Sequence, residues 1–269
     1  MMSRRKFLIL TGAVAAGAIL PAQISAKTQF VESAEEVSAK RRWAMSIDVS
    51  KCTECMEEFI AKTGNPEVKP PCVVACDKEN NVPEFKDKRI DPQWIRIAKL
   101  KLDQPSINPR EFYMPLLCNH CEYPPCVEVC PTHASFKRPD GIVEIDMHRC
   151  IGCRYCMIAC PYGARSFNFV DPRKGLKEIN PNVPMRTEGV VEKCTFCVHR
   201  VDEAVAKGEN PIPACVEACH KYGKGAMTFG NIKDPDSELS KTLKDNMPVQ
   251  LRANLGTDPH VFYLKLGGE

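Results

Sequence analysis

Sixteen cysteines are the residues of this chain whose type and spacing could do chemistry, and they fall into four short motifs. Two compact motifs lie near the middle of the chain, at residues 118–131 and 150–161. The second has the spacing C-x2-C-x2-C-x3-C-P, which is the spacing of thiolate ligands to paired [4Fe–4S] clusters. The first has the same spacing with two extra residues between its second and third cysteines. These two motifs predict iron–sulfur clusters.

In such a pair of motifs, three closely spaced cysteines bind one cluster and the fourth binds the other. A proline follows each fourth cysteine, and its fixed φ angle suits the tight turn that leads the chain away. Zinc ribbons instead carry two C-x2-C pairs separated by a spacer, and a disulfide scaffold is the other alternative. The spacing favours iron–sulfur clusters. The first predicted inner site consists of Cys118, Cys121, Cys126 and Cys160, and the second of Cys150, Cys153, Cys156 and Cys130.

Two expanded motifs flank the compact ones, at residues 52–76 and 194–219. Their C-x2-C and C-x3-C pairs are separated by sixteen residues in the first and by seventeen in the second. Pairing the outer motifs with each other predicts two further sites, and therefore four [4Fe–4S] clusters. Neither Cys76 nor Cys219 precedes a proline, so outer disulfides or a single [3Fe–4S] centre stay open as alternatives. The predicted outer sites are Cys52, Cys55, Cys72 and Cys219, and Cys194, Cys197, Cys215 and Cys76.

The charge of the chain argues against nucleic-acid binding. Arg4, Arg5 and Lys6 account for the whole formal net charge of +3. Each thiolate-ligated cluster adds roughly two negative charges. The remaining basic residues are therefore expected to offset cluster charge, because a nucleic-acid site would need a clustered excess. No nucleophile triad, phosphate-binding glycine loop or pair of carboxylates indicates a catalytic site on this chain.

Residues 1–26 are predicted to be an export signal. Arg4 and Arg5 form a twin-arginine pattern, an apolar run follows over residues 7–20, and Ala26 offers a cleavage point. The twin-arginine route moves folded proteins, so clusters assembled in a reducing compartment would cross intact. An ordinary secretory signal and an uncleaved anchor are the alternatives, although the run is short for a bilayer span of about 20 residues. The mature chain is therefore expected at the periplasmic, extracytoplasmic face of the membrane.

Alternation of apolar and polar residues predicts strands at 43–49, 93–102, 141–146 and 165–170. Residues 198–206 have helical composition. These elements and the motifs predict an α+β fold of two interleaved bacterial-ferredoxin-like (βαβ) modules with loop insertions.

The predicted organisation has four parts. They are a signal peptide at 1–26, a linker or arm at 27–42, a four-cluster domain at 43–230 and a C-terminal extension at 231–269. The inner module covers about 112–170, and the outer module covers about 43–90 plus 190–230. The extension is expected to be mostly irregular and to end in an edge strand at 260–264.

Several residues beside the cysteines are candidates for supporting roles. His120 and His199 are not needed as ligands, because sixteen thiols are available. Three aromatic residues within the motifs are expected to shield the clusters from water: Tyr155, Tyr162 and Phe196. Four basic residues flank cysteines and either raise reduction potentials or form a solvated surface: Lys51, Arg149, Arg154 and Lys193.

The chain resembles the four-cluster, ferredoxin-like electron-transfer subunits of modular membrane oxidoreductases. This family includes the polysulfide and dimethyl sulfoxide reductase beta subunits and the NrfC-like iron–sulfur proteins of nitrite reduction. The resemblance extends over residues 43–264. Its specific marks are the motifs at 118–131, 150–161 and 194–219 and the closing segment 259–264.

The resemblance implies a function in electron transfer. Members relay electrons between a quinone-interacting membrane subunit of the NrfD type and a multihaem cytochrome c or catalytic subunit, so membrane contact is made through partners. Within the family, the chain is most similar to the DsrO or HmeA group of DsrMKJOP complexes, which serve sulfate reducers and sulfur oxidisers. Subunits of nitrite, tetrathionate or polysulfide reductases are the near alternatives, and a free soluble ferredoxin carrier is the alternative of another class.

Overall fold

The computed structural model describes residues 38–102 and 110–266. The predicted signal peptide and most of the predicted linker lie outside these residues. No helix among the described residues is both long and apolar enough to cross a membrane.

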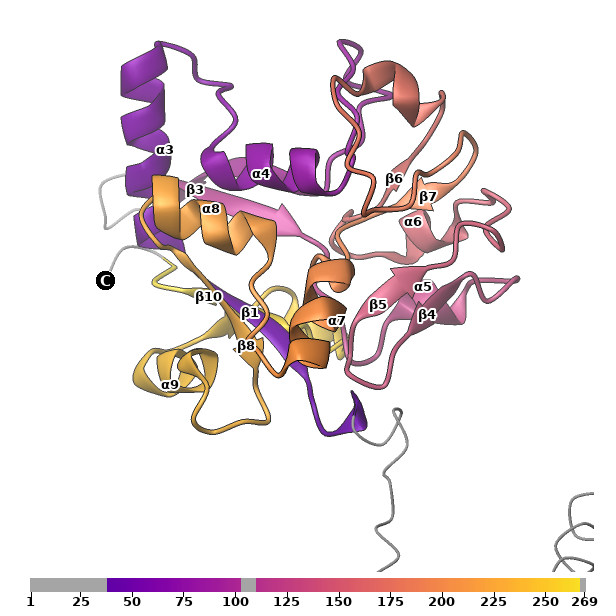
Figure 1. Cartoon of the computed structure of the whole chain (residues 1–269). Coiled ribbons are helices and arrows are strands. Elements are labelled where there is room, and N and C mark those ends of the chain that lie inside the picture. Colours follow the sequence, from indigo (N-terminus) through magenta and orange to yellow (C-terminus); the bar gives the residue numbers. More distant parts are fainter. Residues whose placement is uncertain (1–37, 103–109, 267–269) are drawn as a thin grey trace, which may run out of the picture. The chain divides into compact units, whose positions relative to one another are not determined.

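Strand β1 (Trp43–Asp48) lies in the interior of the largest sheet, and all of its residues are buried. It pairs antiparallel with β8 (Met227–Asn231) and parallel with β10 (Val261–Leu264). The short strand β9 (Val249–Gln250) completes the order β8-β1-β10-β9. Segments from the two ends of the described chain are therefore neighbours in one sheet (Figure 1).

The C-terminal segment is part of this sheet, so the prediction of an edge strand at 260–264 is wrong. Strand β10 lies between β1 and β9, and its residues Val261 and Tyr263 are fully buried. A nearly continuous apolar run is typical of a strand that is covered on both faces. Helix α9 (Glu238–Asp245) packs on β8 through the buried Leu239. Both elements belong to the same compact unit as β1.

Helix α3 (Val49–Thr63) follows β1 directly and carries the first C-x2-C pair. Asp48 caps its first turn, where the carboxylate Oδ1 accepts a hydrogen bond from the Ser50 backbone N–H at 3.1 Å. Gly64 ends the helix in the left-handed conformation, at a φ of 67°. The first outer motif is thus fixed at both ends by local capping.

Helices α4 (Pro71–Glu79) and α8 (Ala214–Tyr222) pack against each other and carry the two outer C-x3-C pairs. Pro71 occupies the first turn of α4, and Pro213 precedes α8, where a missing N–H costs nothing. Helix α7 (Val198–Lys207) confirms the helix that composition predicted. All three helices therefore follow or contain cysteines of the outer motifs.

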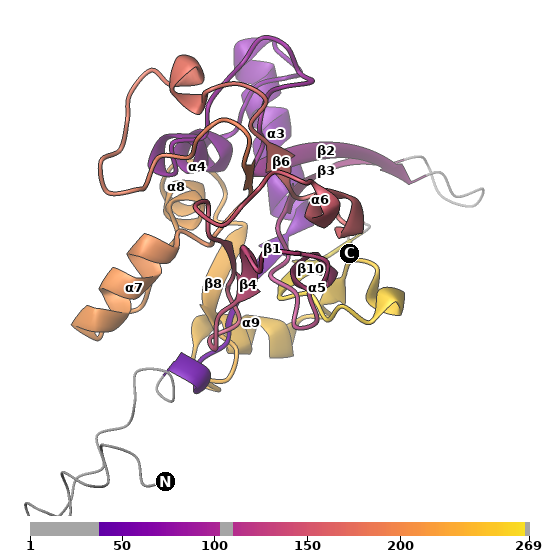
Figure 2. The same ribbon diagram turned by 90° about the vertical axis from the view of Figure 1, so that its right-hand side faces the viewer.

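Three two-stranded sheets complete the described fold. They are β2 (Ile95–Leu102) with β3 (Arg110–Leu117), β4 (Ser135–Lys137) with β5 (Val143–Ile145), and β6 (Ser166–Phe167) with β7 (Val191–Glu192). The four predicted strands are confirmed, although most are shorter than expected. Figure 2 shows the β2–β3 hairpin extending away from β1.

The inner motifs carry only short helices, α5 (Pro125–Glu128) and α6 (Tyr155–Ala159). Two 3-10 turns, Pro172–Gly175 and Ala253–Leu255, lie in loops. In Figure 1, α5 and α6 lie on the right with β4 to β7, whereas α3, α4 and α8 lie on the left. The fold mixes helices and strands, which confirms the α+β class.

Tyr263 allows a test of whether the C-terminal strand is integral to the fold. Its buried hydroxyl donates a hydrogen bond to the Pro115 carbonyl oxygen at 2.8 Å, which ties β10 to β3. We expect Tyr263→Phe to cost about 1–3 kcal/mol, because this carbonyl then lacks its partner. The apparent melting temperature, followed by circular dichroism, should fall by about 2–4 °C per kcal/mol. Tyr222→Phe, at an exposed position, should leave it unchanged, and equal melting of both variants would contradict the assignment.

Candidate iron–sulfur centres

All sixteen cysteines lie within the described residues, and all are free thiols. The structure brings them together in four groups of four, which we name A to D. Group A is Cys52, Cys55, Cys72 and Cys219; group B is Cys76, Cys194, Cys197 and Cys215; group C is Cys118, Cys121, Cys126 and Cys160; group D is Cys130, Cys150, Cys153 and Cys156.

Group A joins α3, α4 and α8. Its four thiols line one cavity, whose other walls include Ile97, Tyr113 and Met227. Burial raises the pKa of the Cys52 thiol, and the charges of the other three thiols raise it further. A thiolate in this apolar cavity therefore needs a cation beside it.

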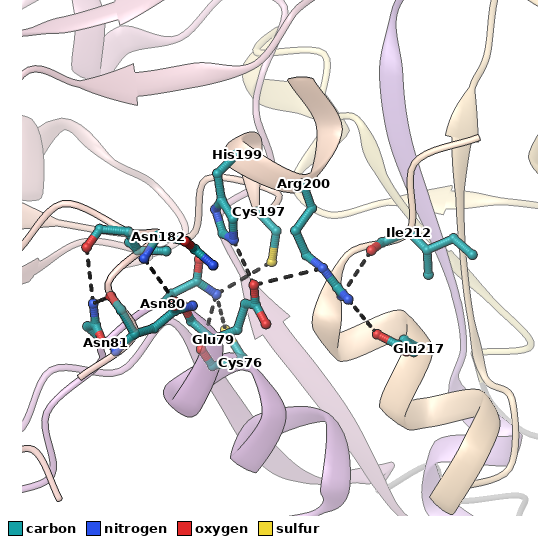
Figure 3. Close-up of polar contacts among 12 residues, drawn as sticks. Cys76, Glu79, Asn80, Asn81, Asn182, Cys197, His199, Arg200, Ile212 and Glu217 are labelled. Atoms are coloured by element: carbon teal, nitrogen blue, oxygen red, sulfur yellow. Dashed lines mark hydrogen bonds and ion pairs between the residues drawn. The ribbon is translucent and has the colours of Figure 1, made fainter. Parts of the chain in front are cut away.

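Group B is the most deeply buried of the four. Burial raises the pKa of Cys76 well above its ordinary value, and the charges of the other three thiols of the group add to this. Asn80 lies one helical turn after Cys76 and donates its side-chain N–H to the Cys197 sulfur at 3.5 Å (Figure 3). The Phe196 backbone N–H also donates to the Cys194 sulfur, at 3.4 Å. These donors stabilise negative charge on the sulfurs.

Groups C and D involve the inner motifs. In group C, burial and then the charge of Cys118 raise the pKa of Cys121 to about 12. The four thiols of group D line one cavity together with Arg165 and Val191. In contrast to the other groups, group D reaches the surface, because Cys153 is exposed.

The four groups follow one another in the order A, B, C, D. Burial and the other thiols of group B raise the pKa of Cys215, and the charge of Cys72 in group A adds to this. The charge of Cys118 in group C raises the pKa of Cys194 in group B, second only to burial. Groups C and D meet at Arg165, which faces thiols of both. These interactions place A beside B, B beside C and C beside D.

Among the four flanking basic residues, only Lys193 is buried. Its ammonium group donates to the carbonyl oxygens of Val143 and Cys194. Lys51, Arg149 and Arg154 are exposed, and Arg149 pairs with Asp146. The structure therefore favours the interpretation that these three residues form part of a solvated surface.

The histidines and aromatic residues take different positions. His120 is fully buried and stacks on Phe196 at 3.8 Å between ring centres. Burial lowers its pKa, so the ring is neutral, and its Nδ1 accepts a hydrogen bond from the Val143 N–H. His199 contacts the Glu79 carboxylate at 2.7 Å. Phe196 is buried and fits the shielding role, whereas Tyr155 is 59% exposed and does not.

Asn80 and Arg165 contact cysteine sulfurs but were not singled out from the sequence. Asn80 follows Cys76 by four residues, so the i to i+4 rule of a helix face could have found it. Arg165 gave no such signal, because a surface arginine looks the same in sequence. Arg186 and Glu192, a buried ion pair beside Asn80, were missed for the same reason.

Two comparisons with known proteins bear on these centres. A family model described as a 4Fe-4S dicluster domain matches residues 110–174, and a second model of the same description matches residues 149–222. The chain is 81% identical to the Hdr-like menaquinol oxidoreductase iron-sulfur subunit 1 of Archaeoglobus fulgidus, over the whole of both chains.

More distant relatives are of the same kind. The chain is 38% identical to the menaquinone reductase iron-sulfur cluster-binding subunit of Nitratidesulfovibrio vulgaris, over 84% of this chain and 89% of the relative. It is 37% identical to a tetrathionate reductase subunit of Salmonella typhimurium, over 98% and 88% of the two chains. The chain belongs to the family of 4Fe-4S dicluster electron-transfer subunits. As a member of that family, it holds four [4Fe–4S] clusters and serves an oxidoreductase complex without being a catalytic subunit itself.

The residues present fit four such clusters. Each group offers four thiols, which is the number that one cubane requires. Two of the groups line cavities of their own. Within residues 38–102 and 110–266, no three cysteine, histidine or acidic side chains converge closely enough to hold a single metal ion. A cubane presents its irons at separate corners, so its ligands stand further apart than those of one ion.

The buried pair of Arg186 and Glu192 gives a test of how the interior beside Asn80 is stabilised. The Arg186 Nε donates to Glu192 Oε2 at 2.5 Å, and its other N–H groups donate to the Asn80 and Asn81 carbonyl oxygens. We expect Arg186→Leu to cost about 3–5 kcal/mol, because it leaves the Glu192 carboxylate buried without its cation. Chemical denaturation of the cluster-loaded chain, followed by far-ultraviolet circular dichroism, measures this.

The matched control is Arg173→Leu. Arg173 also forms an ion pair with a carboxylate, that of Asp171, but in solvent. We expect no measurable loss of stability there, because exposed ion pairs contribute little. Similar losses in the two variants would show that burial of the Arg186 pair is not what matters.

Proposed function

We propose that groups A to D each ligate one [4Fe–4S] cluster and that the chain relays single electrons along the line A, B, C, D. The observation that carries this proposal is the order of the groups. Helices α4 and α8 each carry one cysteine of A and one of B, Cys194 of B interacts with Cys118 of C, and Arg165 contacts group C and lines the cavity of group D. A cubane bound by four thiolates takes up and releases one electron at a time. The contribution of the protein is to hold the thiols, exclude water and supply N–H donors to sulfur.

The two modules are interleaved in this arrangement. The fourth cysteine of each motif belongs to the partner group, so Cys76 joins group B and Cys219 joins group A. In the same way Cys130 joins group D and Cys160 joins group C. The outer module is therefore assembled from the two ends of the domain, with the inner module between them. Contacts between α4 and α8 support this pairing.

Group D is where electrons would pass between this chain and a partner at the surface. Cys153 is exposed, and the neighbouring Ile151 and Ile158 are 67% and 84% exposed. Exposed apolar side chains around a redox centre suit a docked partner, because they lose water when they are covered. The thiols of groups A and B, in contrast, are all buried.

The partners are inferred from the relatives. Two of them are named for menaquinol or menaquinone, which supports a quinone-reactive membrane subunit of the NrfD type on one side. A multihaem cytochrome c or other redox subunit on the other side would complete a complex of the DsrMKJOP kind. A tetrathionate reductase subunit is also among the relatives, so a terminal reductase is the alternative partner. The twin-arginine pattern at residues 3–8 supports an extracytoplasmic location.

The first test is the cluster content of the chain purified without oxygen. Four clusters require sixteen iron and sixteen acid-labile sulfide ions per chain. We expect both counts near sixteen, and both near eight for a variant with Cys72→Ser and Cys215→Ser, one ligand from each of groups A and B. A count near sixteen in the double variant would contradict the proposed ligand sets. Zinc without sulfide would contradict the electron-transfer proposal as a whole.

The second test separates a complex subunit from a free carrier. We expect the chain to co-purify with an integral membrane protein after gentle solubilisation. In that preparation, a reduced menaquinone analogue should reduce the clusters, as followed by electron paramagnetic resonance. The isolated chain should stay oxidised with the same quinol, because it lacks the quinone site. A chain that is found only as a monomer, in a membrane-free fraction, would instead favour the soluble carrier.

A further inference from the structure

Arg165 is a buried cation that has no carboxylate partner among residues 38–102 and 110–266. Only 5% of its surface is exposed, and its hydrogen bonds within the described residues go to a thiol and a hydroxyl. Burying a guanidinium group costs several kcal/mol unless a negative charge stands beside it. Arg186, which is the other buried arginine among the described residues, meets this requirement with Glu192. Arg165 must meet it in another way.

The negative charge available to Arg165 is on sulfur. Its Nη2 donates to the Cys126 sulfur of group C at 2.8 Å and to the Ser135 hydroxyl oxygen at 2.8 Å. Arg165 and Cys156 of group D also line the same cavity. Ser135 in turn donates its backbone N–H to Cys130 of group D, at 3.4 Å. The guanidinium group therefore stands between two groups of thiols.

Two N–H-bearing atoms of Arg165, Nε and Nη1, are buried and have no hydrogen-bond partner among the described residues. Buried donors of this kind normally have a partner, because leaving one unpaired costs about 1–3 kcal/mol. Arg165 also lines the cavity that the four thiols of group D surround. In this position, the sulfide and thiolate sulfurs of a cluster would accept hydrogen bonds from these unpaired donors.

We propose that Arg165 is a positioning residue shared by groups C and D, one cation whose N–H groups raise the reduction potentials of both inner clusters. This inference rests on the proposed ligand sets. Reduction of a cluster adds one negative charge to it. A cation and N–H···S hydrogen bonds therefore favour the reduced form, and more strongly in a low-dielectric interior than in water.

The other cations near these groups do not have this geometry. Lys193 donates to two carbonyl oxygens. Arg154 stacks over Phe167 at 5.2 Å from the ring centre, and Arg149 pairs with Asp146 in solvent. Arg149 precedes Cys150 directly in sequence, so Arg149→Gln is the matched control for loss of one positive charge beside group D.

The test is a redox titration of the full, cluster-loaded chain, followed by electron paramagnetic resonance. In Arg165→Gln we expect two of the four one-electron transitions to move to lower potential. At a fixed potential, the ratio of reduced to oxidised cluster should fall about tenfold in each, which corresponds to about 59 mV. The other two transitions, and all four in Arg149→Gln, should not move. Arg165→Lys keeps the charge but loses the fork of donors, so its two shifts should be smaller.

Three results would overturn the inference. The reduction potentials of Arg165→Gln could be unchanged in all four transitions, shifted in only one, or shifted equally in all four. If Arg165→Gln loses iron, the Arg165→Lys variant is used instead. An Arg165→Lys chain with its full iron content and unchanged reduction potentials would count against the role of Arg165. Iron and sulfide counts of the unaltered chain separate this inference from the proposed function. A chain without clusters contradicts the proposed function, whereas sixteen iron ions with unmoved potentials contradict only the role of Arg165.

Discussion

The constraint on which the rest of this structure depends is the concentration of sixteen thiols inside one protein. Burial raises the pKa of thiols such as Cys52, Cys76 and Cys215, so these side chains would be neutral without a cation. Iron supplies that cation, and thiolates are the form that binds it. Cysteines of groups A and B also form part of the hydrophobic core. Under the proposed ligation, cluster binding and folding of the core are therefore one process.

The concentration of buried thiols also explains the hydrogen-bond donors of the interior. Asn80 and the backbone N–H groups of Ser135, Phe196 and Ala226 donate to cysteine sulfurs. Such donors stabilise thiolates without adding a charge that must itself be compensated. Arg165 differs, because a buried cation is stable only where negative charge is present in every redox state. A cubane with four thiolate ligands stays negative after oxidation, so it meets that condition.

Local patterns predicted much of this molecule, because they depend on neighbours in sequence. The strand at 43–49, the helix at 198–206 and the cluster-type cysteine spacings needed no tertiary information. The place of β10 inside the sheet was missed, since a short apolar run is equally compatible with an edge and with an interior position. Arg165 was missed because no local pattern separates a buried arginine from a surface one. Outside the paired cysteine motifs, local patterns leave open which distant segments come into contact.

The proposed electron path has two kinds of step, those set by local geometry within a motif and those set by tertiary packing. Cys72 and Cys76 lie one turn apart on α4 and belong to groups A and B, and Cys215 and Cys219 on α8 do the same. The spacing of these ligand positions is therefore fixed by helix geometry, at about 6 Å of rise for four residues. Similarly, Cys126 and Cys130 connect C to D within one motif.

No motif connects B to C. The interaction of Cys118 with Cys194 links them, and it is made by tertiary packing. The buried Lys193 and the stack of His120 on Phe196 fill this junction, and both His120 and Lys193 bond to Val143 of β5. A change in the packing there would alter the B to C distance while leaving all sixteen cysteines in place. The distance of the middle step, from B to C, is thus determined by the tertiary fold rather than by the cysteine spacing.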